Sequence, residues 1–418
     1  MKKIIKLEHI SKIEGHAKLT IKIEQGKVKK TRLDIFEGAR FFEAIIMNRK
    51  YDEVPWLTSR ICGVCSTSHL IASIMAVEDA FKVKISEQTR LLRELLHIGA
   101  IMQSHAIHLF FMVLPDYLGF ESAIQMAKKK KKIISLALNV KKAGVDIVTL
   151  IGGRDFHPIT ATIGGFSRIP KKKEVIALLD NLKKKKKKII QAASLFSKLN
   201  YPKFERDAQY FALHGDKYNV LDGRISCHGN YCIPNINYSD YFKEHIKKGS
   251  TAKYVLYHGK PFFVGALARV NTNYKFLSKD AKKKIVESKN PYLNNLAQAV
   301  EIIHFLDRSI EILENLKLKK EKLPKIKLQK SRGVSVIEAP RGLLFHDYEF
   351  NEKGFVTKAN IITPTAINIK NIEGDIKEYL PTILSKQKEE IVLELEKLIR
   401  AYDPCISCST HFLKVKWE

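Results

Sequence analysis

The sequence predicts a predominantly helical α+β fold in which long central helices accompany a small antiparallel sheet near the N-terminus. Apolar and polar residues alternate in the strand manner over the first 36 residues, and apolar residues recur at helical spacing in several later segments. The chain has 418 residues, 45% of them hydrophobic, and can bury a large core. Because no internal repeat and no Ser/Gly/Pro-rich linker interrupts it, we expect one domain over residues 1–418.

The N-terminal strands are predicted from a period-two pattern on both sides of a turn at Gln25-Gly26. The apolar positions of this pattern are Leu19, Ile21, Ile23, Val28, Leu33 and Ile35. Residues of alternate sequence position face the same side of a strand, so this spacing predicts an antiparallel hairpin or small sheet with one buried face.

The longest predicted helix begins after Ser86, a residue type that caps helix N-termini, and ends at Pro115, because proline interrupts helical hydrogen bonds. Its apolar periodicity indicates a central, mostly buried helix. Further helices are predicted over residues 128–147, 171–198, 291–318 and 385–401. Loops and short strands are predicted over residues 201–275 and 331–365.

Two lysine runs shape the charge of the chain. The formal net charge is +29, and Lys128–Lys132 and Lys183–Lys188 contribute 11 of the positive charges. A strongly basic protein is a candidate for nucleic-acid binding. Here, however, the runs are homopolymers without interleaved aromatic residues, so we interpret them as solvated helix faces and expect no nucleic-acid partner.

The hydropathy and the cysteine count favour a cytoplasmic protein that is not inserted into a membrane. The sequence contains no run of about 18 consecutive apolar residues, and the initial segment MKKIIKLEHISKIEG lacks the apolar core of a signal peptide. Six cysteines are too few for a secreted disulfide framework, and four of them form two Cys-x-x-Cys pairs. Reduced thiolates that hold metal fit this pattern better.

The two cysteine pairs lie in similar motifs at opposite ends of the chain, RICGVCSTSH at 60–69 and DPCISCSTH at 403–411. Two intervening residues let both sulfurs of a pair reach one ion, and four thiolates suit zinc, nickel or iron rather than hard cations. In a structural zinc site the two pairs usually lie about 15–20 residues apart. The separation is far larger here, yet spacing alone leaves zinc open as an alternative.

Both motifs resemble the metal-binding boxes of nickel-iron hydrogenase large subunits, and other segments match that family in the same order. These segments are KIEGH at 12–16, FEGARFFE at 36–43, SHAIHLFFMVLPDY at 104–117, GGRDFHP at 152–158, EAPRGLLFH at 338–346 and ITPTAIN at 362–368. The wording of several blocks is most similar to cytoplasmic members of the sulfhydrogenase type. The resemblance implies the nickel-iron hydrogenase large-subunit fold over nearly the whole chain.

The resemblance also implies metal ligands and an activity. By position, Cys62 and Cys405 would bind nickel terminally, while Cys65 and Cys408 would bridge nickel to an iron that carries carbon monoxide and cyanide. Such a soft, electron-rich site would split hydrogen reversibly into two protons and two electrons. The electrons would pass first to an iron-sulfur small subunit. From there they would reach NAD(P) or a sulfur acceptor through flavin and electron-transfer subunits.

Three residues in the matched segments would contact the metal ligands. Pro340 and Arg341 belong to EAPRG, and the family match places the Arg341 guanidinium over the open nickel-iron position and against a cyanide. Thr365 would donate to the other cyanide, although PTAIN lacks the tryptophan usual in the family. Without the resemblance, Arg341 would be interpreted as the partner of a core carboxylate.

Four further residues would assist the reaction if the resemblance holds. Glu14 in KIEGH would take the proton from a nickel-bound cysteine, a role that suits a buried carboxyl. Asp116 and Asp403 resemble acidic residues that lie close to Arg341 and hold its guanidinium in place. His69 follows a bridging cysteine by one helical turn, where it could donate to that sulfur; the alternative is an ordinary core histidine.

A magnesium-type ion is implied near the end of the matched region. Glu43, the backbone carbonyl of Ile361 and His411 resemble its protein ligands, and a carboxylate, a carbonyl, an imidazole and waters form a hard-cation site. The remaining cysteines, Cys227 and Cys232, match no strong metal template and are interpreted as ordinary thiols.

The seven residues 412–418, FLKVKWE, resemble the extension that a maturation protease removes after nickel insertion, so we expect cleavage after His411. Two alternative functions come from other classes. One is a non-catalytic, quinone-lining subunit of a respiratory complex, but such relatives lack the paired cysteines. The other is a zinc-stapled, basic nucleic-acid-binding protein.

Overall fold

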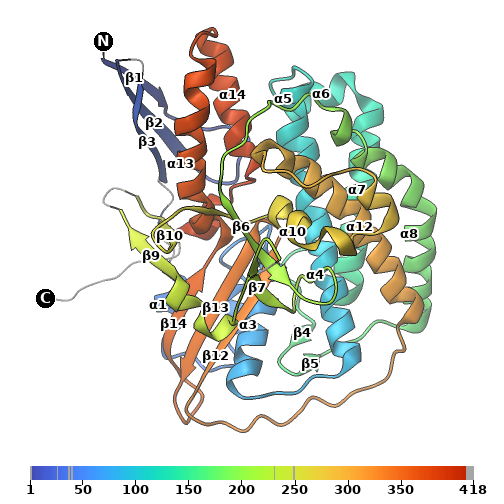
Figure 1. Ribbon diagram of the computed structural model, residues 1–418. Helices are drawn as coiled ribbons and strands as arrows, with labels where there is room; N and C mark the ends of the chain where they lie inside the picture. Colours follow the sequence, from blue (N-terminus) through green and yellow to red (C-terminus); the bar gives the residue numbers. More distant parts are fainter. Residues whose placement is uncertain are drawn as a thin grey trace, which may run out of the picture.

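Four long helices pack together on one side of the molecule and most of the strands lie on the other, as the computed structural model in Figure 1 shows. The structure describes residues 2–25, 27–35, 38, 41–229, 231–247 and 250–410. Four long helices make up the helical side: α4 (Glu87–Ile107), α7 (Lys131–Gly152), α8 (Lys172–Ala193) and α12 (Asn294–Asn315). Helix α4 packs against α7 and α12, and α8 packs against the same two helices. All four were predicted from their apolar periodicity.

Helix α4 begins where the sequence predicts, but the helical segment continues beyond the predicted end. The Ser86 hydroxyl accepts a hydrogen bond from the Thr89 amide at 3.0 Å, which caps the first turn. The predicted end at Pro115 is wrong, because a π-helical segment (His108–Val113) leads into α5 (Leu114–Tyr117). The wider π turn leaves room for the proline ring, which would clash with a carbonyl in a regular α-helix.

The continuous helical segment Glu87–Tyr117 is long and apolar enough, by length and composition, to cross a membrane. However, 83% of its most apolar window is buried inside the protein. A central helix of a folded core meets the same two criteria, so the segment is weak evidence for a membrane span. It is the one such segment in the part of the chain that the structure describes.

The N-terminal sheet is antiparallel and has the predicted hairpin. Its strands β1 (Lys2–Leu7), β2 (Ala17–Glu24) and β3 (Lys27–Ile35) lie in that order, and the predicted apolar positions are buried. Strand β3 packs against α13 (Pro364–Ile383), a helix that was not predicted. Buried polar residues interrupt its apolar pattern; Glu373, for example, accepts a hydrogen bond from the Leu33 amide at 3.0 Å.

A second antiparallel sheet comprises β12 (Ser331–Ala339), β13 (Gly342–Phe350) and β14 (Val356–Ile362). These strands are longer than the short strands predicted for this region. Helix α3 (Ser66–Ala80) packs across β12 and β13. This contact is close, because a Cβ atom added at Gly333 would lie 2.1 Å from the Ala76 carbonyl oxygen. The contact therefore fixes the distance between α3 and the sheet.

Residues 201–275 form loops and short strands, as predicted, together with helix α10 (Ala266–Asn273). Strands β6 (Gln209–His214), β7 (Arg224–Cys227), β8 (Tyr231–Ile233) and β11 (Phe262–Phe263) form one sheet in the order β11-β6-β7-β8, and β9 (Phe242–Ile246) pairs with β10 (Lys253–Tyr257). The remaining short elements are α1 (Phe42–Ile45), α2 (Val54–Thr58), α6 (Ala123–Lys129), α9 (Tyr238–Tyr241), α11 (Lys279–Lys282), α14 (Lys388–Ala401), α15 (Ile406–Ser409), β4 (Ala161–Thr162) and β5 (Gly165–Phe166). Of these, α14 matches the helix predicted over 385–401.

The lysine runs lie on the outside of the helical side. Lys128–Lys132 is exposed where α6 meets α7, and Lys183–Lys188 lies within α8. In the second run, Lys183 pairs with Glu314 at 2.6 Å, and Lys186 pairs with Asp307 at 2.6 Å. Both acidic residues belong to α12, so part of this run contributes ion pairs between neighbouring helices.

The contact between α3 and β12 predicts a large effect of one methyl group. Gly333→Ala should lower the free energy of unfolding by about 2–3 kcal/mol, because the new Cβ overlaps backbone atoms that cannot move independently. Gly374→Ala in α13 is the control: its Cβ would lie 3.4 Å from the nearest atom, and alanine favours a helix by about 0.5–1 kcal/mol. Urea denaturation of both variants measures the difference, and equal stabilities would contradict the packing described.

Candidate metal centre

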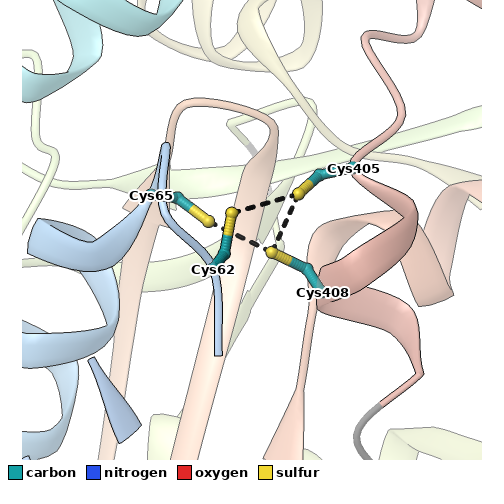
Figure 2. Close-up of side chains that lie close together, drawn as sticks. All are labelled: Cys62, Cys65, Cys405 and Cys408. Carbon is teal, nitrogen blue, oxygen red and sulfur yellow. Dashed lines mark hydrogen bonds between the residues drawn. The ribbon is translucent and has the colours of Figure 1, made fainter. Parts of the chain in front are cut away.

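The two cysteine pairs, from opposite ends of the chain, meet in the interior. Cys65 directly precedes α3, and Cys405 directly precedes α15, which contains Cys408, so each pair lies at the start of a helix. Figure 2 shows the four side chains pointing toward one another from these two helix starts. The chain is tied together beside them, because the Ile406 amide donates to the Glu14 carbonyl oxygen at 2.9 Å.

The four sulfurs form one buried cluster. Cys62 Sγ lies 3.3 Å from Cys405 Sγ, Cys65 Sγ lies 3.1 Å from Cys408 Sγ, and the last two cysteines of the chain are 3.0 Å apart at sulfur. All four donor atoms lie within 4.8 Å of one another, and none of the residues is more than 5% exposed. This arrangement can bind soft metal ions through thiolates.

The cluster is electrostatically incomplete without a cation. Burial raises the pKa of Cys408 well above its usual range, and contact with the Cys408 sulfur raises that of Cys405. Hydrogen bonds from the other cysteines, first Cys405, instead lower the pKa of Cys62. Four thiolates cannot all ionise in so small a dry volume unless a positive charge compensates them. The donor set therefore fits bound metal.

A small cavity of about 10 Å³ adjoins the cluster on one side. It is lined by Cys65, Cys405, Cys408, His69, Ala339, Pro340, Arg341, Leu344, Pro364 and Thr365. Because Arg341 and Thr365 line it, their polar groups are placed to contact a small group bound beside the sulfurs. The four-thiolate donor set and these two residues fit the predicted nickel-iron group.

Arg341 lies at the tip of the β12–β13 hairpin and is held by one carboxylate. Its Nη2 donates to Asp403 Oδ1 at 2.9 Å, its Nε donates to the Asp403 carbonyl oxygen at 2.7 Å, and its Nη1 donates to Ser104 Oγ at 3.3 Å. Although burial alone would lower it, Asp403 and the nearby cysteine sulfurs hold the pKa of Arg341 above its ordinary value. The structure thus places Arg341 and Asp403 together, as the sequence predicts.

Thr365 is the second residue of α13 and touches the cluster directly. Its hydroxyl oxygen accepts a hydrogen bond from the Cys405 amide at 3.0 Å. A hydroxyl that accepts this bond still has its own hydrogen to donate. Because Thr365 also lines the cavity, it is placed to donate to a group bound there.

Glu14 contacts the predicted terminal cysteine. The Cys405 thiol donates to Glu14 Oε2 at 3.1 Å, and the Ser407 amide donates to the same oxygen at 3.0 Å. The expectation of a buried carboxyl is wrong in part, because Glu14 is half-buried. It therefore lies between the sulfur cluster and the surface, and Ser407 is a site residue that the sequence did not reveal.

His69 lies in the first turn of α3, and its ring faces a predicted bridging sulfur. The sulfur concerned is that of Cys408, 3.8 Å from Nε2, rather than that of the neighbouring Cys65. On the other side, Nδ1 of His69 lies 3.1 Å from Nε2 of His346 in β13. The His346 ring in turn contacts the Tyr348 hydroxyl. The place of His346 beside His69 was not predicted from the sequence.

The predicted place of Asp116 beside Arg341 is wrong. The Asp116 carboxylate instead pairs with the guanidinium of Arg400 in α14 and with the ammonium of Lys12. The π-helical segment and α5 carry Asp116 toward the α14 side, where Arg400 also binds the Ser11 carbonyl oxygen at 2.9 Å. Asp116 thus ties the segment before Glu14 to the segment before Asp403.

In the described part of the predicted magnesium site, Glu43 contacts the ammonium group of Lys253. Glu43 Oε1 accepts from the Ile361 amide at 2.8 Å and from Lys253 Nζ at 2.7 Å. Lys253 also contacts Asn360 Oδ1 at 3.1 Å. His411 lies outside the described residues, so Glu43 and Ile361 alone do not build a hard-cation site.

The other two cysteines lie apart from the cluster. Cys227 pairs with Tyr231 and Cys232 pairs with Ser226 across β7 and β8, so the two thiols point to opposite faces of the hairpin. One ion cannot bind both. This geometry agrees with their interpretation as ordinary thiols.

Removal of one clustered sulfur should abolish metal binding. Cys405→Ser is expected to lower bound nickel to background, because a hydroxyl at this position is a much poorer ligand for soft metals than a thiolate. Cys232→Ser, at an exposed cysteine, should leave the metal content unchanged. Elemental analysis of the purified variants makes the comparison; full metal content in Cys405→Ser would contradict the assignment.

Comparison with known families agrees with this centre. The family model for nickel-dependent hydrogenases matches residues 40–136 and 227–411, and a HoxL-like model matches residues 4–37. The alpha chain of sulfhydrogenase 1 from Pyrococcus furiosus is 36% identical, with 98% of each chain covered. An F420-non-reducing hydrogenase chain from Methanothermobacter thermautotrophicus is 30% identical, with 97% of this chain and 94% of its own covered.

Solved structures show the same architecture. The crystal structure of an NAD+-reducing nickel-iron hydrogenase in the H2-reduced state superimposes with a TM-score of 0.88 at 26% identity, over 98% of this chain and 99% of that chain. The fold is therefore the nickel-iron hydrogenase large-subunit fold, as predicted. Since the family match spans both cysteine pairs and full-length relatives exceed 30% identity, this chain belongs to the nickel-dependent hydrogenases, as a catalytic large subunit.

Proposed function

We propose that this protein catalyses the reversible oxidation of H2 to two protons and two electrons, and that it passes the electrons to an iron-sulfur small subunit. The observation that carries the proposal is the four-cysteine cluster beside a cavity that Arg341 and Thr365 line. When bound there, nickel and iron with carbon monoxide and cyanide would supply the redox chemistry that no side chain provides.

In this proposal the polypeptide fixes the site around that group. All four cysteines would hold the metals, Cys62 and Cys405 as nickel ligands and Cys65 and Cys408 as ligands of both nickel and iron. Arg341, held rigid by Asp403, presents a charged donor fork to the cavity, and Thr365 presents its hydroxyl hydrogen. Pro340 and Leu344 keep this side of the cavity apolar, which strengthens each of those hydrogen bonds.

Glu14 moves the proton. Its Oε2 is 3.1 Å from Cys405 Sγ, which is within reach for direct transfer from sulfur to carboxylate. Because Glu14 is half-buried, it can release that proton toward the surface while the sulfurs stay dry. We propose that His69 donates to the Cys408 sulfur and that Asp116 acts indirectly, through Arg400.

The electrons must leave for another chain. Among the described residues, the four clustered cysteines are the one group of side chains that could hold a metal ion. The sequence has only two other cysteines, Cys227 and Cys232, too few to bind an iron-sulfur cluster. Relatives are called sulfhydrogenase and F420-non-reducing hydrogenase subunits, while a structural neighbour is an NAD+-reducing enzyme. We propose a cytoplasmic heteromer with flavin-containing subunits, and the names of these relatives support NAD(P) or a sulfur compound as its electron acceptor.

Hydrogen uptake by the assembled enzyme tests the activity. Cys65→Ser should abolish uptake, and Arg341→Lys should lower its rate about 100-fold, because lysine keeps the charge but not the fixed fork of donors. Arg93→Lys is the control: Arg93 is equally buried but pairs with Glu78 at the far end of α3. Near-normal uptake in both site variants would refute the proposal.

The proton route makes a separate prediction. Glu14→Gln should retain nickel and iron but lose about 100-fold in hydrogen uptake, because an amide cannot carry the proton away from sulfur. Glu8→Gln, an exposed carboxylate of the same N-terminal segment that pairs with Lys18, should behave like the unchanged enzyme. If Glu14→Gln retains full uptake, the proton leaves by another route.

The proposal also covers maturation of the chain and the magnesium-type ion. We propose that a protease removes residues 412–418 after nickel insertion, and that Glu43, Ile361 and His411 then bind a magnesium-type ion, with Lys253 moving off Glu43. Intact mass of the metal-loaded protein should correspond to a chain that ends at His411. A loaded protein that still contains Trp417 would contradict the cleavage.

A further inference from the structure

The turn that carries Arg341 is built into a tight backbone contact. Residues Ala339 and Gly342 close the β12–β13 hairpin, and Gly342 has φ 123°, a conformation that side chains rarely adopt. A Cβ atom at Gly342 would lie 2.7 Å from Val264 side-chain atoms and 2.8 Å from the Gly265 amide nitrogen. The turn thus rests on the segment that begins α10.

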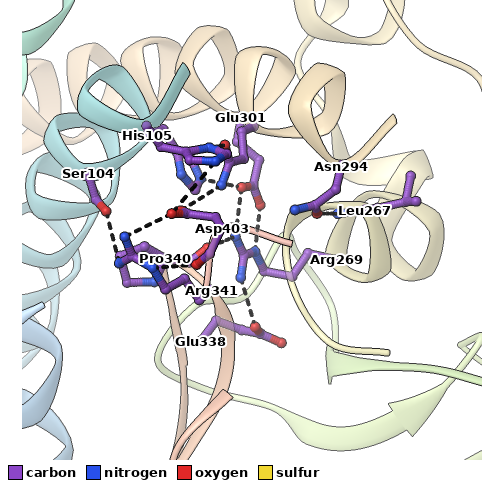
Figure 3. Close-up of polar contacts among 12 residues, drawn as sticks. Ser104, His105, Leu267, Arg269, Asn294, Glu301, Glu338, Pro340, Arg341 and Asp403 are labelled. Atoms are coloured by element: carbon purple, nitrogen blue, oxygen red, sulfur yellow. Dashed lines mark hydrogen bonds and ion pairs between the residues drawn. The ribbon is translucent and has the colours of Figure 1, made fainter. Parts of the chain in front are cut away.

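Helix α10 also sends a buried arginine beneath the turn. Arg269 is fully buried, and its Nη1 donates to the Ala339 carbonyl oxygen at 2.9 Å, while its Nη2 donates to the Pro340 carbonyl oxygen at 3.1 Å. Figure 3 shows the Arg269 side chain on one side of the turn and the Arg341 side chain with Asp403 on the other. The two carbonyl groups therefore face Arg269.

Every donor of Arg269 is used. Besides the two carbonyl oxygens, Nε binds Glu301 Oε1 at 2.6 Å, Nη2 binds Glu301 Oε2 at 2.7 Å, and Nη1 binds Glu338 Oε2 at 3.1 Å. A guanidinium has five N–H groups in a rigid plane, and this environment accepts all five. Lysine has three donors on a flexible stem and cannot satisfy these acceptors together.

Glu301 is in turn fixed from two further sides. The Tyr218 hydroxyl donates to Glu301 Oε1 at 2.6 Å, and His105 Nε2 lies 2.8 Å from Oε2. Although burial opposes ionisation, Arg269 and His105 lower the pKa of Glu301 to about 2, whereas burial raises the pKa of Glu338 to about 7. Arg269 thus has one firmly charged partner and is anchored against movement.

We propose that Arg269 is a positioning residue that holds the Ala339–Gly342 turn, and through it the Arg341 guanidinium, in place beside the four-cysteine site. Its hydrogen bonds to residues that line the cavity go to the backbone carbonyl groups of the turn. The expected effect on catalysis rests on the proposed role of Arg341, whereas the expected rigidity of the turn does not.

Hydrogen–deuterium exchange of the assembled enzyme tests the rigidity. Arg269→Lys should accelerate exchange of the amides in residues 339–343 at least about tenfold, because two carbonyl anchors are lost while a positive charge remains. Arg93→Lys is the matched control, a buried arginine that binds Glu78 with two bonds of 2.6 Å and the Thr162 carbonyl oxygen at 3.1 Å. It should leave exchange in residues 339–343 unchanged.

Hydrogen uptake and metal content are measured on the same samples. Arg269→Lys is expected to keep its nickel and iron and to lose at least about tenfold in uptake. Should this variant fail to assemble, Tyr218→Phe removes one bond to Glu301, leaves Arg269 intact, and should shift both measurements in the same direction by a smaller factor.

Three results would overturn the inference: unchanged exchange in residues 339–343, accelerated exchange with unchanged uptake in Arg269→Lys while Arg341→Lys loses uptake, or equal acceleration in Arg93→Lys. A failure of the proposed function is recognised separately. In that case Arg341→Lys keeps normal uptake, while Arg269→Lys still loosens the turn.

Discussion

The structure depends on one constraint: four sulfurs from the two ends of the chain must meet in a place that water does not reach. Close, buried thiolates repel one another, so the fold has to hold them together until metal compensates their charge. It does so with rigid elements. One pair directly precedes helix α3, which lies against β12 and β13. The other pair lies at the start of α15, and the Glu14 backbone bridges directly to Cys405.

Buried charge pairs around the cluster fix the orientation of the arginine side chains. Arg341 is matched by Asp403, and Arg269 by Glu301, with both arginines nearly inaccessible to water. Removing one member of such a pair costs about 3–5 kcal/mol, although apolar replacements of both can be as stable. Such pairs therefore serve geometry more than stability, because a paired guanidinium in a dry interior has few alternative positions.

The long amphipathic helices and the N-terminal hairpin followed from apolar spacing, since each buries a regular face. The helix α13 did not, because its buried side includes polar residues such as Asn368, whose partner is the Val264 backbone. The end of α4 was also mistaken, since a π turn that accommodates Pro115 depends on tertiary packing. Local patterns describe contacts along the chain, and these exceptions depend on contacts across it.

The site residues also divide into those marked by a local sequence pattern and those that depend on contacts across the chain. The paired cysteines were visible because their spacing is local, and the resemblance added Arg341, Thr365 and Glu14. No local signal marks Arg269, since its partners are backbone carbonyl groups and glutamates far away in sequence. The place of Asp116 was wrong for a related reason. Its nearest cation, Arg400, comes from α14, and only the fold decides which arginine a carboxylate meets.

We propose that this cluster binds nickel and iron with diatomic ligands. Infrared spectroscopy combined with elemental analysis of the purified heteromer tests this proposal most directly. We expect bound nickel, together with absorption bands of metal-bound carbon monoxide and cyanide that vanish in Cys408→Ser. Zinc as the bound metal, or a protein without such bands, would contradict it.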